Sequence, residues 1–341
     1  MLNRRIVNLF LTLLLFFSLL IPTSFADSTS SWPRISQNVL DLDNLGNDHD
    51  DTIDQLIKLR NLGFIEESID FNNIKSYLPE VSKEYQEIEA LHDYSSVILI
   101  DKNSNNVISV DEYLSTSGID PSATNIYIVH FFSFVGNPDS PGAEYVHTGE
   151  VTNCFGLGCS GNQYLIQLNL QTSDYRFFGF INTEYKSDTV KKGVEVVLTY
   201  PINSTKYYKY KSVAYALEGT NIVEADSGES PSDLLNRYGK KYPLDYSDPD
   251  SGIRLYEPPA NLNPNSQPRS STFRSDFIKY YEENFGEPTQ FSWDQVEIHH
   301  MRPLQYGGSN SMLNGIPLMN RSNSHHTIPK HSDLTRWWTY Y

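Results

Sequence analysis

Five runs of aromatic and β-branched residues between positions 124 and 217 constrain the fold of this 341-residue chain most strongly. The runs are residues 127–134, 163–170, 175–181, 194–200 and 207–213. Residues of these types favour strands, and turn residues separate the runs at short intervals. The pattern therefore predicts an antiparallel sheet, sandwich or open barrel over residues 121–225. The many tyrosines of these runs are expected to be half-buried strand residues, and a binding surface is the alternative.

The segments on either side of this predicted β-rich domain have a different character. Residues 27–120 read as a mixed, largely helical region, because residues 51–62 and 81–91 carry apolar side chains at helical spacing. Residues 226–268 are rich in Pro, Asn, Asp and Ser, which is typical of an extended linker. The sequence thus predicts a multidomain α+β protein.

The first 26 residues have the composition of a secretory signal peptide. Arg4 and Arg5 precede a mostly apolar stretch over residues 6–21, and a small-residue pattern ends at Ala26. A membrane anchor is the alternative, but the apolar stretch is short for a membrane span. We expect cleavage before Asp27, a secreted or extracellular product, and no stable membrane insertion afterwards.

The only two cysteines, Cys154 and Cys159, lie close together in a Gly-rich stretch. Exported proteins meet oxidising surroundings, so a local disulfide is the expected state. Free thiols are an alternative. A metal site would need two more soft ligands nearby, and the neighbouring sequence offers none.

Residues 101–112 match the twelve-residue calcium loop of EF-hands in several positions at once. Oxygen-bearing side chains fall at the ligand positions, which are Asp101, Asn103, Asn105 and Glu112. However, Val97–Ile100 reads as a strand where an entering helix should be, and no partner loop is present. The sequence supports either a structural calcium site or a polar turn between strands.

The densest chemistry lies near the C-terminus, where five of the nine histidines fall within 33 residues: His299, His300, His325, His326 and His331. Neutral imidazole is a common metal ligand and general base. A helical pattern over residues 273–285 precedes a strand that ends at His299–His300, then a turn over 301–310 with Gly307–Gly308 at its tip. A return strand over 315–319 and a final helix that carries His331 complete a strand–turn–strand–helix order.

This ordered set, from Glu297 through Asn314 to the Trp337–Trp338 pair, resembles the HNH nuclease motif, or ββα-metal fold. The closest version is the His-His type of bacterial nuclease toxins, and the resemblance covers residues 269–341. It implies that His299 binds a metal and that His300 is the general base. It also implies that Asn314 ties down the turn and orients the base, while Glu297 lies close to the metal.

The remaining ligands depart from the family pattern. The family has His-x3-His at the start of its last helix, whereas four residues after His331 stands Thr335. His326 and His331 are therefore the predicted ligands, with His325 as the alternative to His326. Arg302 is a candidate phosphate contact or an ordinary surface charge. The cofactor would be a divalent metal, with Zn, Mg, Mn and Ni all compatible.

The net charge of −16 disfavours nucleic-acid binding by the chain as a whole. Residues 269–341, however, hold seven basic and seven acidic side chains, so the predicted nuclease module is neutral and the acidity lies upstream.

The sequence therefore predicts an exported metal-dependent endonuclease that hydrolyses DNA, or RNA, with low sequence specificity. A C-terminal nuclease after an unrelated region is also the arrangement of antibacterial toxins, which require an immunity protein, and a nucleic-acid-scavenging enzyme is the other role. The alternative function is a calcium-stabilised extracellular binding or adhesion protein with a structural zinc site at its C-terminus.

Overall fold

The computed structural model describes residues 48–62, 80–101, 106–115, 124–155, 163–218, 221–243, 246–319 and 331–341. All of these belong to the second of two compact units, residues 34–341. The predicted signal peptide, residues 1–26, lies outside the described residues.

The N-terminal region holds less helix than its sequence suggests. Helix α2, Asp48–Asn61, forms where residues 51–62 predict it. The helix predicted over residues 81–91 is wrong, because a short 3-10 helix η3, Glu80–Glu84, gives way to strand β1, Ile88–Asp101. Strand β1 pairs along its length with the strand over residues 124–136. This pairing stabilises the extended conformation more than the helical spacing of its apolar residues favours a helix.

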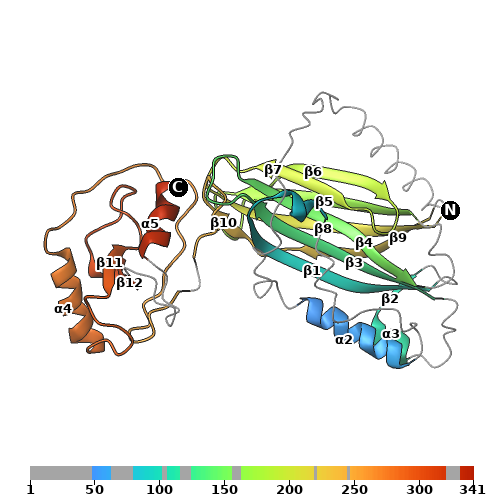
Figure 1. The fold of residues 1–341 in the computed structure, drawn as a ribbon, viewed down its shortest axis with the longest axis horizontal. Coiled ribbons are helices and arrows are strands. Elements are labelled where there is room, and N and C mark those ends of the chain that lie inside the picture. Colours follow the sequence, from blue (N-terminus) through green and yellow to red (C-terminus); the bar gives the residue numbers. More distant parts are fainter. Residues whose placement is uncertain are drawn as a thin grey trace. The chain divides into compact units, whose positions relative to one another are not determined.

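Two antiparallel sheets form the β-rich part of the molecule (Figure 1). The first has the order β2-β1-β3-β4-β7, with β2 Asn106–Ile108, β3 Thr124–Gly136, β4 Glu144–Phe155 and β7 Val196–Pro201. The second has the order β10-β8-β5-β6, and β9 also pairs with β8. Its strands are β5 Gln163–Ser173, β6 Ile181–Val190, β8 Lys206–Glu218, β9 Asn221–Glu229 and β10 Asp233–Leu235.

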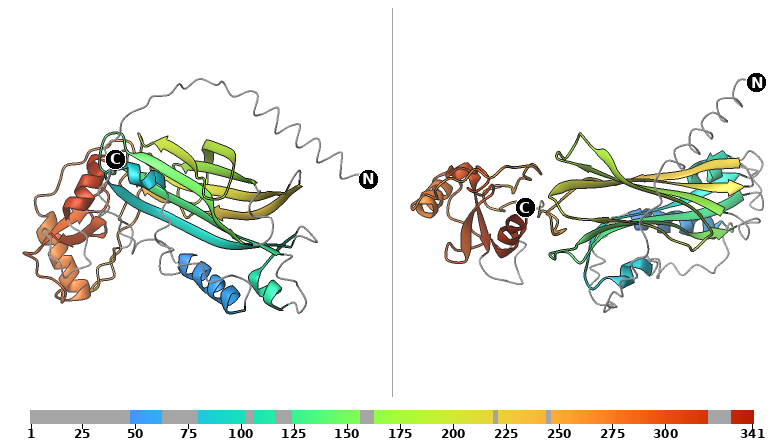
Figure 2. Two further views of the ribbon diagram at one scale, coloured as in Figure 1. Left: turned by 45° about the vertical axis from the view of Figure 1, so that its right-hand side comes forward. Right: turned by 90° about the horizontal axis from the view of Figure 1, so that it is seen from above.

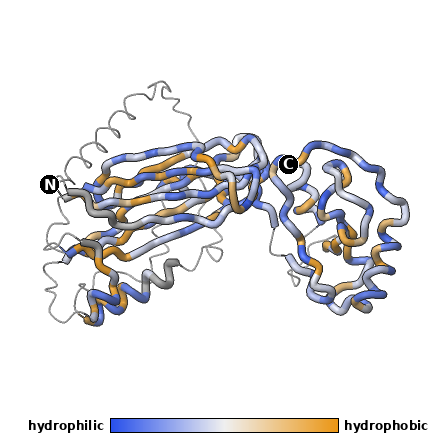
Figure 3. The backbone as a smooth tube through the Cα atoms, turned by 180° about the vertical axis from the view of Figure 1, so that it is seen from behind, coloured by the Kyte–Doolittle hydropathy of each residue, from blue (hydrophilic) through white to orange (hydrophobic). Residues whose placement is uncertain are grey.

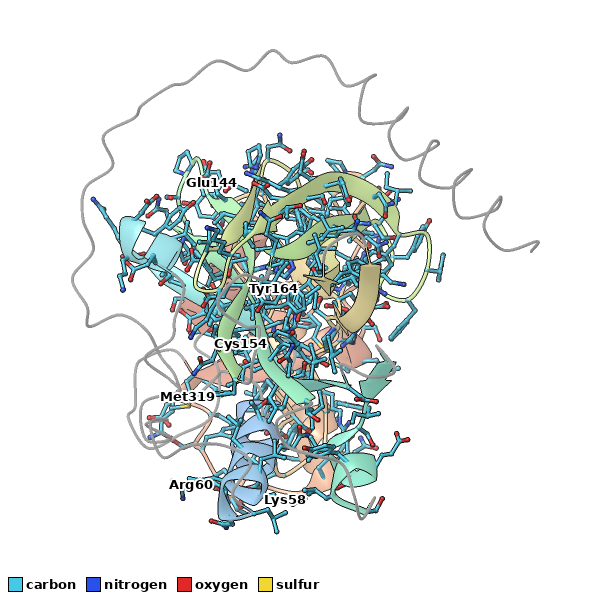
Figure 4. The ribbon with its side chains drawn as sticks, turned by 90° about the vertical axis from the view of Figure 1, so that its right-hand side faces the viewer. Lys58, Arg60, Glu144, Cys154, Tyr164 and Met319 are labelled. Carbon is cyan, nitrogen blue, oxygen red and sulfur yellow. The ribbon has the colours of Figure 1, made fainter. Side chains whose placement is uncertain are left out.

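Aromatic pairs join the facing surfaces of the two sheets. The rings of Tyr145 and Tyr208 stack with centroids 5.6 Å apart, and Tyr127 meets Tyr164 edge-on at 5.5 Å. Figure 2 shows the two layers, and Figure 4 labels Tyr164 on β5 and Cys154 on β4. The architecture is thus a β-sandwich with an aromatic core, in agreement with the predicted antiparallel β-rich class.

The outer face of the first sheet is covered as well. Tyr85 packs edge-on against Phe134 at 5.5 Å near η3. Leu56 and Leu59 of α2 join a cluster with Tyr113 of α3, Val110–Ser115, on the same sheet (Figures 1 and 3). With partners on both faces, every residue of β3 is buried, which explains its nearly continuous apolar sequence.

The strand predicted over residues 175–181 is wrong. Those residues connect β5 to β6, and the side chains of Phe177 and Phe178 are 84% and 63% exposed. The hydroxyl of Ser173 donates to the Phe178 carbonyl at 2.7 Å, and Gly179 has φ +72°. These two features close a turn that a continuous strand could not make.

The C-terminal module follows the predicted order of elements. Helix α4 spans Phe273–Phe285, β11 spans Val296–His300, β12 spans Gly315–Met319, and α5 spans His331–Thr339. Together with the sandwich they make an α+β protein, as predicted. None of the helices in the described part of the chain is long and apolar enough to cross a membrane.

Residues 226–268, predicted as a linker, contribute to both folded parts instead. Their first residues complete β9 and form β10. Further along, the hydroxyl of Tyr246 donates to the Pro317 carbonyl at 3.1 Å, and Tyr281 donates to the Asp248 carboxylate at 2.5 Å. The high proline and asparagine content of this segment correctly indicated irregular backbone. It did not indicate an extended linker, because these side-chain contacts fix the segment against the C-terminal module.

One buried histidine in the sandwich has a defined proton arrangement. His147 of β4 is fully buried and stacks on Tyr210 of β8 with centroids 4.1 Å apart. Its Nδ1 lies 3.1 Å from the Phe132 carbonyl, which can only accept, so Nδ1 carries the proton. Nε2 then accepts from the Ser212 hydroxyl at 2.5 Å. Burial lowers the pKa of His147 to about 3, so the folded state holds this ring neutral.

Phe131 and Phe177 provide a test of the sandwich core. Phe131 is fully buried, whereas Phe177 is 84% exposed. Phe131→Ala is expected to lower the free energy of unfolding by about 3–5 kcal/mol, because it leaves a cavity between the sheets. Phe177→Ala is the matched control and should change it by less than about 0.5 kcal/mol. Urea unfolding of both variants measures the difference, and equal losses would contradict the assigned core.

His147 also makes stability depend on pH. Its pKa of about 3 in the fold lies below the ordinary histidine value of 6.5, so the unfolded chain binds a proton that the folded chain excludes. The free energy of unfolding should therefore fall by up to about 1.4 kcal/mol per pH unit as pH drops from about 6.5 towards 3. His147→Gln should remove this contribution, as measured by urea unfolding at pH 7 and pH 5. An unchanged pH dependence in that variant would refute the role of His147.

Candidate metal and nuclease site

The hairpin of β11 and β12 carries the first half of the site. The strands pair in antiparallel register, with His299 opposite Ile316 and His300 opposite Gly315. Val296, Ile298 and His300 are buried, whereas Glu297 is exposed and His299 is half-buried. Because strand residues alternate between faces, Glu297 and His299 share one face, and His300 lies on the other.

The last helix brings a second histidine to the face of His299. Leu334, Trp337 and Trp338 form the buried side of α5, and His331 begins the helix beside them. The rings of His299 and His331 lie with centroids 4.9 Å apart and are tilted by 58°. The Thr335 hydroxyl, one turn after His331, lies 3.4 Å from Nε2 of His299. Three polar side chains from β11 and α5 thus converge.

The hydrogen bonds of His299 fix its tautomer. Nδ1 lies 2.7 Å from the His300 carbonyl, an obligatory acceptor, so Nδ1 donates and Nε2 presents its lone pair towards α5. Burial, then the neighbouring His331, lowers the pKa of His299 to about 4, so the ring is neutral. A neutral imidazole whose far nitrogen is held by a carbonyl is the usual state of a metal-binding histidine.

His300 occupies a different environment. Its ring is 7% exposed and stacks on Phe273 of α4 with centroids 3.9 Å apart. Burial lowers its pKa, so this imidazole is also neutral near pH 7. Its Nε2 is shielded from solvent and has no hydrogen-bond partner among the described residues. The ring also has a side-chain hydrogen bond with Asn310, and it lies on the opposite face of β11 from His299.

Asn314 holds the turn between the two strands in shape. Its Oδ1 accepts from the backbone N–H of Arg302 at 2.9 Å and from the Tyr256 hydroxyl at 3.2 Å. Its Nδ2 donates to the carbonyls of Arg302 at 3.0 Å and Ser309 at 2.9 Å. Asn314 is therefore a clamp on residues 301–309, and none of these four hydrogen bonds is to the His300 ring.

The other two predicted residues have structural partners. Glu297 lies 3.7 Å from Arg274 in an ion pair, with half of its side chain exposed. Burial lowers the pKa of His331, and the charge of Glu297 opposes that shift. The Nε of Arg302 donates to the Tyr306 carbonyl at 2.7 Å. Arg302 thus supports the turn with part of its guanidinium, which reduces its suitability as a phosphate contact.

Arg269 is the cation that sequence reasoning missed. Its charge contributes to lowering the pKa values of His299, His300 and His331 alike, after burial as the main cause, and the side chain is exposed. The side chain of Asn310 accepts from the Ser270 N–H at 3.1 Å and donates to the Pro268 carbonyl at 2.9 Å, which fixes this segment. In the sequence Arg269 is a single basic residue after a Pro-rich stretch, and no motif there indicates that it lies near the histidines.

Two of the three predicted metal ligands, His299 and His331, are described and lie side by side. Within the described ranges, no group of three His, Cys, Asp or Glu side chains could hold a metal. His325 and His326, one of them a predicted ligand, lie outside those ranges. Nε2 of His299 lies 3.4 Å from the Thr335 hydroxyl, and the ring of His331 is its neighbour, so these two imidazoles are the described groups that could bind a transition metal.

The predicted calcium loop is described only at its ends. Asp101 ends β1 and pairs with Asn106 of β2, whereas Asn103 and Asn105 lie outside the described residues. The predicted strand before the loop is confirmed as part of β1. The backbone N–H of Glu112 donates to the Ser109 hydroxyl at 3.0 Å, which is an N-cap contact of α3. Calcium binding stays a prediction.

The structure describes one of the two cysteines of the predicted disulfide. Cys154, in β4, is disulfide-bonded. Cys159, the second cysteine of the chain, lies outside the described residues.

Comparisons with protein-family models, with curated proteins and with solved structures find no match for this chain.

Asn314 gives a test of the turn geometry. Asn314→Asp replaces the Nδ2 donor by an acceptor that faces two carbonyls, which should cost about 1–3 kcal/mol of stability. Faster amide hydrogen exchange at residues 301–309, followed by mass spectrometry, would report the loosened turn. Asn284→Asp is the control, because the Asn284 side chain is exposed and donates to one carbonyl of its own helix. Equal exchange in both variants would contradict the clamp.

Proposed function

We propose that this chain is an exported, metal-dependent endonuclease that hydrolyses phosphodiester bonds of DNA, or of RNA, with little sequence preference. The observation that carries the proposal is the convergence of His299 and His331 on the accessible face of a strand–turn–strand–helix unit. The Asn314 clamp on the turn of the same unit supports it. The resemblance of residues 297–338 to HNH nucleases supports the same assignment.

The residues divide the chemistry of hydrolysis between two faces of β11. His299 and His331 would hold a divalent ion, which supplies Lewis-acid stabilisation of the leaving oxygen. His300 is the proposed general base, since its neutral ring has an uncommitted Nε2. Base action requires Nε2 to become accessible when substrate binds, because Phe273 covers the ring.

Charge near the site favours a phosphodiester substrate. Arg269 is exposed and acts on all three described histidines of the module. A guanidinium in that position can neutralise one phosphate, whereas the net charge of −16 opposes binding elsewhere on the chain. Arg269 is therefore the proposed phosphate contact, ahead of Arg302.

Two biological roles share this chemistry. A nuclease placed after an unrelated region suits an antibacterial toxin, which would act with an immunity protein that protects the producer. A secreted scavenger of nucleic acid is the second role. Both require export, for which the apolar segment over residues 6–21 is the supporting feature.

Cleavage of plasmid DNA tests the proposal directly. The mature chain is incubated with supercoiled plasmid in EDTA, Mg²⁺, Mn²⁺, Zn²⁺ or Ni²⁺, and nicking is followed on gels. We expect metal-dependent nicking by the wild type. His300→Ala should reduce its rate roughly 10²-fold to 10⁴-fold, because a general base is lost.

Lys279→Ala is the control, since this exposed side chain in the middle of α4 pairs with Glu283. Metal affinity, measured by calorimetry, should be unchanged in His300→Ala and reduced in His331→Ala. Nicking by His300→Ala at the wild-type rate would refute the mechanism. No cleavage of plasmid or of RNA with any of these metals would refute the nuclease itself.

A further inference from the structure

Strand β6, Ile181–Val190, forms an open edge of the second sheet. It pairs with β5 on one side and ends the order of strands (Figure 1). Every residue from 184 to 189 is exposed. We propose that two copies of this chain associate through β6, antiparallel and related by a two-fold axis at Ser187, so that their second sheets join into one. The inference does not depend on the proposed function.

The first step of the argument is how little of β6 its own chain covers. In the register with β5, Lys186 and Asp188 lie opposite Leu168 and Ile166. Both of these β5 side chains are fully buried in the sandwich core, so they mark the inward face of the sheet. Lys186 and Asp188 share that face and are nevertheless exposed, so the first sheet does not cover this part of β6. Within the described part of the chain, no strand pairs with the outer side of β6.

The second step is the order of charges along the strand. Glu184, Lys186 and Asp188 alternate in sign on the inward face. With Ser187 on the axis, Lys186 of each copy lies opposite Asp188 of the other, which gives two pairs of opposite charge. A shift by two residues puts Lys186 opposite Lys186 and Glu184 opposite Asp188, which is repulsive. Inward charges hinder indiscriminate pairing at a sheet edge, and here they leave a favourable register.

The third step is the backbone of β6. It follows β5 regularly from Glu184 to Val190, and the register shifts between Glu184 and Asn182. With Ser187 on the axis, the new ladder uses the regular residues 184–190 alone. A second register, with Tyr185 on the axis, also matches opposite charges, but its ladder would include the irregular residues 182–183. An extra residue disrupts ladder hydrogen bonds, so the geometry favours the axis at Ser187.

The fourth step is the exposed apolar surface beside the strand. Ten large hydrophobic side chains are exposed in the described part of the chain, and six of them lie within residues 175–194: Tyr175, Phe177, Phe178, Ile181, Tyr185 and Val194. Phe177 and Phe178 precede β6, whereas Val194 follows it. Antiparallel pairing brings the loop before β6 of one copy towards the turn after β6 of the other. Association would thus remove from water an apolar patch that a single copy leaves exposed.

Charge reversal at the two paired positions tests the inference. The full mature chain is studied by sedimentation velocity over a range of concentrations, and the wild type should shift from monomer to dimer as concentration rises. Lys186→Glu places two acidic pairs across the axis, and Asp188→Lys places two basic pairs there. Each variant alone should raise the dissociation constant of the dimer about tenfold to 100-fold.

An equimolar mixture of these two variants gives the sharper result. In a mixed dimer each altered residue again faces a residue of opposite charge. The mixture should therefore dimerise with close to wild-type affinity, although neither variant does so alone, and this recovery shows that both variants are folded. Lys279→Glu is the control, because it makes the same charge reversal at an exposed position of α4 and should leave the dissociation constant unchanged.

Three outcomes would overturn the inference. The first is a wild-type chain that stays monomeric at every concentration. The second is a dimer that Asp188→Lys leaves unchanged, which would place the interface elsewhere or move the axis to Tyr185. The third is a mixture that dimerises no more tightly than its separate variants, because the pairing of Lys186 with Asp188 would then be absent.

Discussion

Burial of Trp337 holds the last helix in place, and the whole candidate site depends on that helix. The indole N–H donates to the Lys240 carbonyl at 2.8 Å, and Asn236 donates to the Trp337 carbonyl at 3.2 Å. Tyr242 meets the same indole edge-on at 4.6 Å. Because Trp337 is fully buried, α5 has one favourable rotation about its axis, and that rotation turns His331 and Thr335 towards β11. Packing far from solvent therefore determines the geometry of an exposed polar cluster.

The short strand β11 serves two environments at once. Its alternation gives His299 a half-buried face beside α5 and gives His300 a covered face beside Phe273. Burial lowers the pKa of both rings, so neither carries a charge near neutral pH. The two neutral rings lie on opposite faces of the hairpin and do not repel one another. One could supply a nitrogen for a metal, and the other could accept a proton. The Asn314 clamp keeps the turn from shifting this register.

The sequence predicted well wherever local periodicity and tertiary contacts favour the same structure. The helix predicted over residues 273–285 and the return strand over 315–319 have those bounds in the structure. Prediction failed where distant partners decided the outcome. Residues 81–91 have helical spacing, but residues 88–90 pair with β3. Residues 226–268 look like a linker but are fixed by partners such as Pro317 and Tyr281. Arg269 was not predicted because its effect on the three histidines depends only on its neighbours in space.

The segment before α4 has a consequence for how this chain could be processed. Tyr246 and Asp248 bind Pro317 of β12 and Tyr281 of α4, and Asp250 accepts from the Thr289 hydroxyl at 2.5 Å. Residues 263–269, which are exposed, lie downstream of these contacts. A protease that cut there would separate the histidine-bearing hairpin and helix from part of their own core. A fragment that keeps the Asn236 hydrogen bond to Trp337 therefore begins before Asn236, and one that keeps the whole buried cluster around Trp337 also includes Tyr207 of β8.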